Sequence, residues 1–560
     1  MRRAFLLFAF LALVALACSP TEKSNAQAST SIDWEPCGSI ECAKFNVPLD
    51  YGNASGKTIE LSLIRIKARK PDQRIGVLLA NPGGPGASAN DFVRIWRGVL
   101  ASDIRDKFDI VSFDPRGVGE SSPILCHDNL QALVAADPDP DTDAEWQQAE
   151  KVAKDFADGC QAKYGDILPY LGTKNVARDM DRIREALGEQ QLNYIGYSYG
   201  TSLGAVYADM FPTHIRSMVL DGGTDLSLSF EDVNRTQMIG FERALSAYLA
   251  DCKAKSCLGG PDPRATVQAI MAKAELNPIA ATGADRPAGP GEVELGILSA
   301  MYSKQMWGLL TRALQDAQNG DGTGLVRLTD SYLERAQNGD YPNLIEANAA
   351  VNYVDEECPK DPDAYKALAA AFAKDAPTFG ASAATSGLAC AYWKAKADPV
   401  TAPTAKGAPP IVVIATTNDP ATPYEWGKAL SQQLSSGVLV THRGEGHTIY
   451  AQGDACIDGV VNAYLLTLAV PAAGTSCGTG APPPGESSSV TPAPSPPSEA
   501  TVAATRTATP TIAIDATPGP PSTGASRGNG SMEVAISAIG LAVVAASLAG
   551  VIVLTAVRRR

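Results

Sequence analysis

The sequence predicts an α/β fold with a mostly parallel sheet, helices on both faces and an inserted helical domain. First, short apolar runs alternate with helix-like segments in two separated parts of the chain, which is typical of strands joined by helical crossovers. Second, most of these runs are apolar throughout, which indicates burial on both faces. Third, the strand pattern disappears over 225–406. With 45% hydrophobic and 19% charged residues among 560, the chain can bury a large core.

The expected elements follow in order along the chain. The first half of the core is predicted over 31–224, with strands at 75–80, 108–113, 192–197 and 218–220 and helices at 176–187 and 201–210. Residues 225–406 are predicted to form a helical cap, because loops rich in proline and glycine break this region into helices. The second half of the core is predicted over 407–477, with strands at 411–415 and 438–440 around a helix at 424–434.

The N-terminal end of the chain is predicted to direct export. Residues 1–17 resemble a secretory signal peptide, because Arg2 and Arg3 precede an apolar run that is too short to span a membrane. Small residues end this run and Cys18 follows directly, as in a bacterial lipoprotein. Ordinary cleavage by signal peptidase and lipidation of Cys18 both stay open.

The C-terminal end is predicted to anchor the protein. Residues 478–531 are rich in Pro, Ser, Thr, Ala and Gly, so we expect a stalk without a core of its own. Residues 534–557 are uncharged and long enough for a transmembrane helix, and three arginines follow as a positive-inside stop. The segment 520–524 resembles a sortase cell-wall sorting signal, with Pro520 in place of leucine. We therefore expect an exported protein held at the cell membrane or the cell wall.

The cysteine count agrees with export. Apart from Cys18, ten cysteines remain in sequence-local couples, without the C-x-x-C spacing of zinc sites. We expect five disulfides between nearest neighbours, and no metal or cofactor. The candidate pairs are Cys37 with Cys42, Cys126 with Cys160, Cys252 with Cys257, Cys358 with Cys390, and Cys456 with Cys477. The net charge of −14 argues against nucleic-acid binding, which requires a basic surface.

The strongest chemical motif is Gly196-Tyr197-Ser198-Tyr199-Gly200, which fits Gly-x-Ser-x-Gly. A predicted strand runs directly into Ser198 and a predicted helix follows, which is the context of the nucleophile turn in α/β-hydrolases. Small residues on either side of the serine are needed because the turn is sharp. The turn would present the Ser198 hydroxyl at the carboxyl edge of the sheet, where ligands bind in such folds.

A nucleophilic serine needs an acid and a histidine base, which follow the serine in this order in α/β-hydrolases. Of the four histidines, His447 lies in a glycine-rich loop after the last predicted strand, so we favour it over His442 at the end of that strand. Asp419 follows the strand at 411–415 and precedes His447, so it is the predicted acid. Ser198, Asp419 and His447 are therefore the predicted triad.

Acyl transfer also needs hydrogen-bond donors for the oxyanion that develops on the substrate carbonyl. We expect one from the backbone N–H of Tyr199, directly after the nucleophile. The second is expected from the loop 83–86 (Gly-Gly-Pro-Gly), because glycines allow main-chain N–H groups to approach a substrate closely. Gly84 is the best candidate in that loop.

These motifs resemble a known family. The segments 34–51, 81–88, 114–121, 177–223 and 418–448 are similar to those of secreted bacterial tripeptidyl aminopeptidases, which are related to proline iminopeptidases. The resemblance implies the α/β-hydrolase fold, the same triad and a helical cap over the site. It also implies removal of short peptides from a free N-terminus. Because the family includes carboxylesterases, the fold and the triad do not fix the substrate.

An aminopeptidase must bind the ammonium group of its substrate, and carboxylates do this best. Asp355, Glu356 and Glu357 form an acidic cluster in the predicted cap, close to where relatives place such groups. A solvated acidic turn would explain the same run of charge. Two further functions stay open: a carboxylesterase or lipase with the same triad, which needs no free N-terminus, and a non-catalytic surface binding module on this scaffold.

Overall fold

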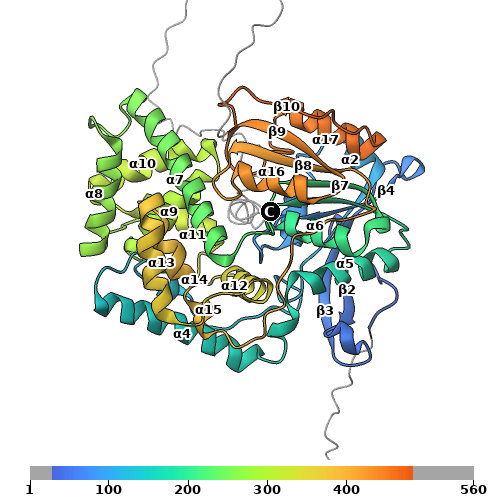
Figure 1. Ribbon diagram of the computed structural model, residues 1–560, viewed down its shortest axis with the longest axis horizontal. Helices are drawn as coiled ribbons and strands as arrows, with labels where there is room; N and C mark the ends of the chain where they lie inside the picture. The colour runs from blue at the N-terminus through green and yellow to red at the C-terminus, as the bar shows by residue number, and fades with distance from the viewer. Residues whose placement is uncertain (1–27, 484–560) are drawn as a thin grey trace, which may run out of the picture.

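The computed structural model describes residues 28–483 and builds them around a ten-stranded sheet (Figure 1). The strand order is β1-β2-β3-β5-β4-β6-β7-β8-β9-β10. The pairings from β1 to β5 are antiparallel, and those from β5 through to β10 are parallel. The strands are β1 (Glu35–Cys37), β2 (Ile40–Pro48), β3 (Thr58–Ile66), β4 (Gly76–Asn81), β5 (Phe108–Phe113), β6 (Leu192–Tyr197), β7 (Ile215–Asp221), β8 (Ile411–Asn418), β9 (Gly437–Glu445) and β10 (Ser476–Cys477).

Helices cover both faces of the sheet, as predicted. One face packs against α5 (Thr173–Ala186), α6 (Tyr199–Met210) and α16 (Tyr424–Gln433). The other face packs against α1 (Ala89–Trp96), α2 (Ser102–Lys107) and α17 (Ala455–Thr467). Neighbouring strand residues point to opposite faces, so Leu79 packs with the first group of helices and Leu78 with the second. Burial of both residues explains why β4 is apolar throughout.

The predicted core elements are confirmed, with small differences at their ends. β5 and β6 have the predicted bounds, and α6 begins two residues earlier than predicted, directly after Ser198. α5 forms where Val176, Met180 and Ile183 recur at helical spacing and are fully buried. The sequence prediction missed the strands β1, β2, β3 and β10 and the helices α1, α2, α17 and α4 (Asp143–Tyr164). The strand β3 is polar at some positions between its buried apolar residues, so it does not form the continuous apolar run that identifies a central strand.

Between β7 and β8 the chain forms helices, apart from one isolated bridge between Ile279 and Ala288. Most of these helices share a hydrophobic core of their own (Phe241, Ile297 and Leu310 belong to it), and Figure 1 shows them gathered at one side of the sheet. The helices are α7 (Phe230–Lys255), α8 (Pro263–Leu276), α9 (Pro290–Met301), α10 (Trp307–Gln318), α11 (Thr323–Tyr332), α12 (Leu344–Asp355), α13 (Pro362–Asp375), α14 (Gly380–Gly387) and α15 (Ala389–Tyr392). The helices α12 and α15 instead contribute to the hydrophobic core that contains α4, α5 and α6.

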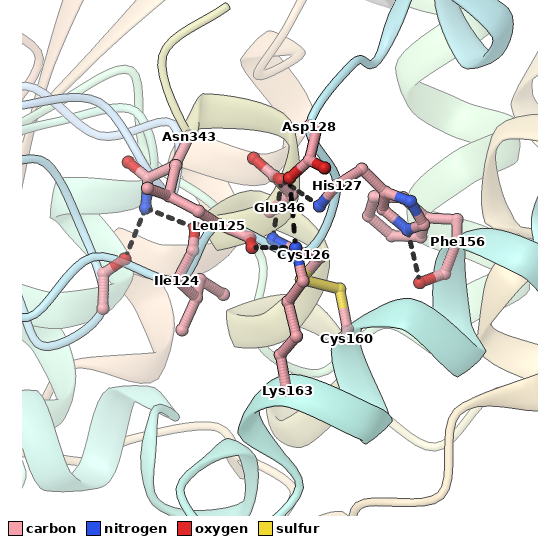
Figure 2. The surroundings of a disulfide bond; sticks show 11 residues. Ile124, Leu125, Cys126, His127, Asp128, Phe156, Cys160, Lys163, Asn343 and Glu346 are labelled. Carbon is pink, nitrogen blue, oxygen red and sulfur yellow. Dashed lines mark hydrogen bonds and ion pairs between the residues drawn. A yellow bond between two sulfur atoms is a disulfide. The ribbon is translucent and has the colours of Figure 1, made fainter.

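The structure joins the ten cysteines of its described part in the five pairs that the sequence suggests. The disulfide between Cys126 and Cys160 joins the loop after β5 to α4. Figure 2 shows Asn343 and Glu346, from the start of α12, next to this loop. The Glu346 carboxylate accepts the backbone N–H groups of Cys126 at 2.9 Å and His127 at 3.3 Å. Asn343 donates to the carbonyl oxygen of Ile124 at 3.0 Å. The start of α12 is therefore anchored to the core by buried hydrogen bonds.

Several predictions on location lie outside the described residues. These are the signal peptide over 1–17, lipidation at Cys18, most of the stalk over 478–531, and the transmembrane helix over 534–557. Within residues 28–483, no helix has both the length and the apolar character needed to cross a membrane.

Candidate active site

Ser198 occupies a strained turn between β6 and α6. Its backbone has φ 54° and ψ −126°, which is unfavourable for a residue with a side chain. The neighbouring glycines are required by size, because a Cβ at Gly196 would lie 2.1 Å from the carbonyl oxygen of Gly200. A Cβ at Gly200 would lie 2.7 Å from the carbonyl oxygen of Asn81 in β4. The Gly-x-Ser-x-Gly pattern is therefore a packing requirement of this turn at the carboxyl edge of the sheet.

His447 and Asp419 form a buried pair. The Nδ1 atom of His447 lies 2.9 Å from Oδ1 and 3.0 Å from Oδ2 of Asp419. The Asp419 carboxylate is held in turn by the backbone N–H groups of Ala421 and Thr422, each at 2.9 Å. With Nδ1–H donating to Asp419, the Nε2 atom of His447 is left to accept a proton.

The fold brings Ser198 and His447 to the same point of the sheet edge, on either side of the end of β7. The backbone N–H of Ser198 donates to the carbonyl oxygen of Asp221 at 2.9 Å. The next residue, Gly222, is so close to the imidazole that a Cβ there would lie 3.2 Å from Cε1 of His447. Within residues 28–483 as described, no hydrogen bond joins Ser198 Oγ to His447 Nε2. Such contacts are often long in a free enzyme and shorten when substrate binds.

The other histidines have different partners. His442, the competing candidate, lies in β9 with Nδ1 3.2 Å from Oγ1 of Thr416 and Nε2 3.5 Å from Asp454. Burial lowers the pKa of His442. His127 lies 3.1 Å from the carbonyl oxygen of Phe156, and His214 pairs with Asp181. Among the histidines of the described chain, His447 alone contacts Asp419.

The cap contributes to the position of His447. The backbone N–H of His447 donates to the carbonyl oxygen of Tyr302 at 2.9 Å, and the Tyr302 ring meets the imidazole edge-on with 5.5 Å between ring centres. Thr422 also reaches the pair: its Oγ1 atom lies 3.1 Å from Oδ2 of Asp419 and 3.2 Å from Nδ1 of His447. Sequence reasoning missed Thr422, although it lies in the turn that carries the predicted acid.

The loop 83–86 packs directly on the nucleophile turn. A Cβ at Gly83 would lie 2.9 Å from Cβ of Ser198 and 3.0 Å from the backbone nitrogen of Tyr199. The N–H of Gly83 donates to Oδ1 of Asn81 at 2.9 Å, so it is not free for a substrate. Gly84 therefore stays the predicted second donor. Tyr199 is the first residue of α6, so its N–H has no intrahelical acceptor.

Helix α12 contacts residues next to both expected oxyanion donors, Gly84 and Tyr199. In its N-terminal half, the Asn348 side chain donates to the carbonyl oxygen of Pro85 at 3.1 Å. At the other end, Asp355 accepts the N–H of Thr173 at 2.8 Å and its hydroxyl at 2.6 Å, and the same hydroxyl is hydrogen-bonded to the phenol of Tyr199. Sequence reasoning found neither Asn348 nor Thr173, because both act through residues far away in the sequence.

The predicted acidic cluster is split by the fold. Asp355 binds Thr173 beside Tyr199, and Glu356 is half-buried next to it, whereas Glu357 is exposed to solvent. Burial raises the pKa of Asp355 to about 7, although the hydrogen bonds from Thr173 act in the opposite direction. Burial and the neighbouring Asp355 raise the pKa of Glu356 to about 7 as well. Two of the three residues thus lie near the nucleophile turn with unusually weak acidity.

Comparison with known proteins agrees with this geometry. The alpha/beta hydrolase fold family matches residues 76–261, and the family described as TAP-like protein matches residues 376–477. The serine protease Hip1 of Mycobacterium tuberculosis is 36% identical over 476 residues, which cover 80% of this chain and 91% of the relative. The chain belongs to the α/β-hydrolase superfamily. It is a serine hydrolase, and the relatives named as peptidases support a serine peptidase.

This hydrolase has other relatives of similar identity. Tripeptidyl aminopeptidase of Streptomyces lividans is 34% identical over 480 residues, 81% of this chain and 88% of the relative. Carboxylesterase B of Mycobacterium tuberculosis is 37% identical over 473 residues, 82% of this chain and 90% of the relative. Among solved structures, proline iminopeptidase of Mycobacterium smegmatis covers 75% of this chain and 97% of its own, with a TM-score of 0.32 and 15% identity.

Proposed function

We propose that this serine hydrolase is an exported, surface-anchored aminopeptidase that releases short peptides from free N-termini. The observation that carries the proposal is the position of the half-buried acids Asp355 and Glu356. Asp355 ends α12 and binds the Thr173 hydroxyl, which is hydrogen-bonded to the phenol of Tyr199, the residue directly after the nucleophile candidate. Glu356 follows Asp355 in the chain. A carboxylate at this place can receive the substrate ammonium while the scissile carbonyl lies at Ser198.

In the proposed reaction, Nε2 of His447 takes the proton of the Ser198 hydroxyl as its oxygen attacks the scissile carbonyl carbon. Asp419 holds the imidazole in the required tautomer and stabilises the imidazolium. The N–H groups of Tyr199 and Gly84 stabilise the negative charge on the carbonyl oxygen. His447 then donates the proton to the leaving amine, which departs with the rest of the peptide. Water, activated by His447, hydrolyses the acyl-enzyme and regenerates Ser198.

The raised pKa values of Asp355 and Glu356 support an amine-binding role for these two residues. A pKa of about 7 means that Asp355 and Glu356 are readily protonated when no cation is present. A substrate ammonium favours their ionised forms, so binding would release protons near neutral pH. Glu357 is solvent-exposed and supports the role less well.

A second candidate function is carboxylester hydrolysis. The relative named carboxylesterase B is as similar to this chain as the named peptidases are, and the same triad would serve an ester. An esterase of this kind needs no ammonium group on its substrate, so the two functions differ in a measurable way.

The proposed location depends on the sequence of the two ends. The signal-like segment over 1–17 supports export, and the uncharged segment over 534–557 with its following arginines supports an anchor in the membrane or transfer to the wall. Lipidation at Cys18 would give a second anchor. Peptides with a free N-terminus outside the cell are the corresponding substrates.

The full chain should be assayed with chromogenic tripeptides, proline derivatives and short acyl esters, each peptide with a free and with a blocked N-terminus. We expect cleavage of free peptides and loss of activity on blocking. Replacing the pair by amides (Asp355→Asn with Glu356→Gln) should raise KM for free peptides and leave short acyl esters unaffected, and Glu357→Gln is the matched control. Equal rates on free and blocked peptides would contradict the aminopeptidase, and hydrolysis of the acyl esters alone would favour the esterase.

A further inference from the structure

Asp221 contacts both halves of the reaction site. It is the last residue of β7, and its carbonyl oxygen accepts the N–H of Ser198 at 2.9 Å. Its carboxylate oxygen Oδ2 accepts the N–H of Ile449 at 2.9 Å and that of Tyr450 at 2.7 Å. These are the second and third residues after His447. One residue therefore holds both the turn that carries the nucleophile and the loop that carries the base.

The loop held by Asp221 has an unfavourable backbone. Thr448 and Ala451 have φ values of 58° and 62°, which cost free energy for residues with a side chain. Ile449 and Tyr450, the residues between them, are the two that donate to Asp221. Without this acceptor the loop could relax, and His447 would move with it because it directly precedes Thr448.

The Asp221 carboxylate is also a buried charge without a neutralising partner of its own. The side chain is fully buried, and Oδ1 accepts no hydrogen bond from any residue in the described part of the chain. The titratable groups that face it are Tyr197 in β6, Asp419 after β8 and His447. Of these three, the imidazole of His447 is the group that becomes a cation during the proposed reaction. Burial raises the pKa of Asp221 to about 6, and the hydrogen bonds from Ile449 and Tyr450 act in the opposite direction. A positive charge on His447 also lowers this pKa, whereas the charge of Asp419 raises it.

The charge itself requires an explanation. An asparagine would offer the same two backbone N–H groups an acceptor oxygen without placing an isolated charge in the core, which is costly. A carboxylate at this position gains only if a positive charge develops nearby. His447 provides that charge each time it takes the proton of Ser198.

We propose that Asp221 is a positioning residue for the reaction, which fixes the spacing between Ser198 and His447 and supplies a second buried negative charge beside the imidazole. This inference rests on the proposed role of His447 as the base. It adds to the role of Asp419, which binds Nδ1 of His447 directly.

The test is the variant Asp221→Asn in the full chain, assayed over pH 5 to 9 on a short acyl ester, whose KM is expected not to depend on Asp355 and Glu356. We expect kcat to fall roughly 10- to 100-fold with little change in KM, because asparagine keeps an acceptor for the two N–H groups but removes the negative charge that stabilises the imidazolium. We also expect the acid limb of the kcat/KM profile to move down by about one pH unit, since removing a neighbouring negative charge lowers the pKa of a histidine. A purely structural role would not move this limb.

Asp458→Asn is the matched control, because the Asp458 carboxylate accepts the N–H of Ala451 in the same loop at 2.8 Å. We expect its acid limb to stay at the wild-type position. A folded Asp221→Asn variant with an unmoved acid limb would overturn the proposal, whatever happens to kcat.

If Asp221→Asn fails to fold, the Nδ1–H resonance of His447 can be followed by NMR in the wild type between pH 5 and 8. Two titration steps, one from the imidazole and one from Asp221, would support the proposal, and one step would overturn it. The proposed aminopeptidase function is tested separately. A wild type that hydrolyses acyl esters but no free peptides contradicts that function, and the acid limbs of the wild type and of Asp221→Asn can still be compared on the esters.

Discussion

Asn348 in α12 donates a hydrogen bond from its side chain to the carbonyl oxygen of Pro85, across 3.1 Å and 263 residues of sequence. Pro85 directly follows Gly84, the expected oxyanion donor. The two backbones are also in close contact, because a Cβ at Gly86 would lie 2.7 Å from the carbonyl oxygen of Leu344. A helix of the cap thus supports the loop that is expected to stabilise the transition state.

Replacing Asn348 by alanine should therefore reduce catalysis more than binding. Without the bond to Pro85, the N–H of Gly84 loses its fixed direction, and a displaced oxyanion donor costs roughly 10- to 100-fold in kcat. KM should change little, because an oxyanion donor acts mainly in the transition state. Steady-state kinetics measure both constants. Asn319→Ala is the control, because it removes an exposed hydrogen bond from Asn319 to the Gln315 carbonyl, and it should have no effect. If Asn348→Ala raised KM and left kcat unchanged, the role of Asn348 in holding the oxyanion loop would be contradicted.

The acidity of Asp355 and Glu356 predicts a pH dependence of substrate binding. Burial raises both pKa values to about 7, so both carboxyl groups become protonated as the pH falls through 7. A neutral carboxyl group attracts an ammonium group weakly, and KM for free peptides should rise by up to about tenfold per pH unit for each proton taken up. Esters without an amine should keep their KM over the same range.

Initial rates between pH 6 and 7.5 test this dependence, since the substrate amine stays largely protonated there. The double variant Asp355→Asn with Glu356→Gln should show a high KM that no longer depends on pH. A wild-type KM that is flat across this range would contradict an amine-binding role for the pair.

The buried pair of Arg116 and Asp179 predicts a large effect on stability. Both side chains are fully buried, and the guanidinium also donates to the carbonyl oxygens of Pro48, Leu49 and Tyr170. Arg116→Met would leave the Asp179 carboxylate buried without its cation, which costs roughly 3–5 kcal/mol in free energy of unfolding. Urea unfolding followed by circular dichroism measures the loss. Lys57→Met is the control, because it breaks the exposed ion pair with Asp166 and should leave the urea midpoint of unfolding unchanged. An equal loss of stability in both variants would contradict the argument that burial makes the Arg116–Asp179 pair important.

The parts of the site that could be predicted from sequence depend on neighbours in the chain. Ser198 is flanked by the glycines that its turn requires, and the strand and helix around it are continuous segments. Asp419 and His447 each follow a late core strand, and the order of serine, acid and histidine assigned their roles. The disulfide pairs could be predicted for the same reason, because each joins cysteines at most 34 residues apart.

The parts that could not be predicted depend on contacts between distant segments. Asp355 reads as one of three acids in a turn, and only the fold separates it from Glu357 by pairing it with Thr173, 182 residues away. Asn348 has no local pattern that identifies it. Asp221 could have been suspected, because it ends a strand at the same sheet edge as Ser198, but its bonds to Ile449 and Tyr450 require the tertiary structure.

Thr422 provides a last prediction, since its hydroxyl reaches both members of the acid–base pair. Oγ1 lies 3.1 Å from Oδ2 of Asp419 and 3.2 Å from Nδ1 of His447, and all three side chains are buried. The hydroxyl can donate to only one of them, and Nδ1–H already donates to Asp419, so we assign its proton to the carboxylate. There it holds the carboxylate in the orientation that aligns the imidazole.

Thr422→Val keeps the shape of the side chain and removes this bond. Hydrogen bonds to charged groups contribute roughly 1.5–3 kcal/mol, so kcat/KM should fall by about 10- to 100-fold. The rate of labelling of Ser198 by a fluorophosphonate should fall in parallel, because it depends on the same base. Thr417→Val is the matched control: its hydroxyl donates to the carbonyl oxygen of Gly444 at 3.3 Å and joins the ends of β8 and β9 without touching the pair. If both variants kept wild-type labelling rates, the hydroxyl of Thr422 would have no part in orienting Asp419.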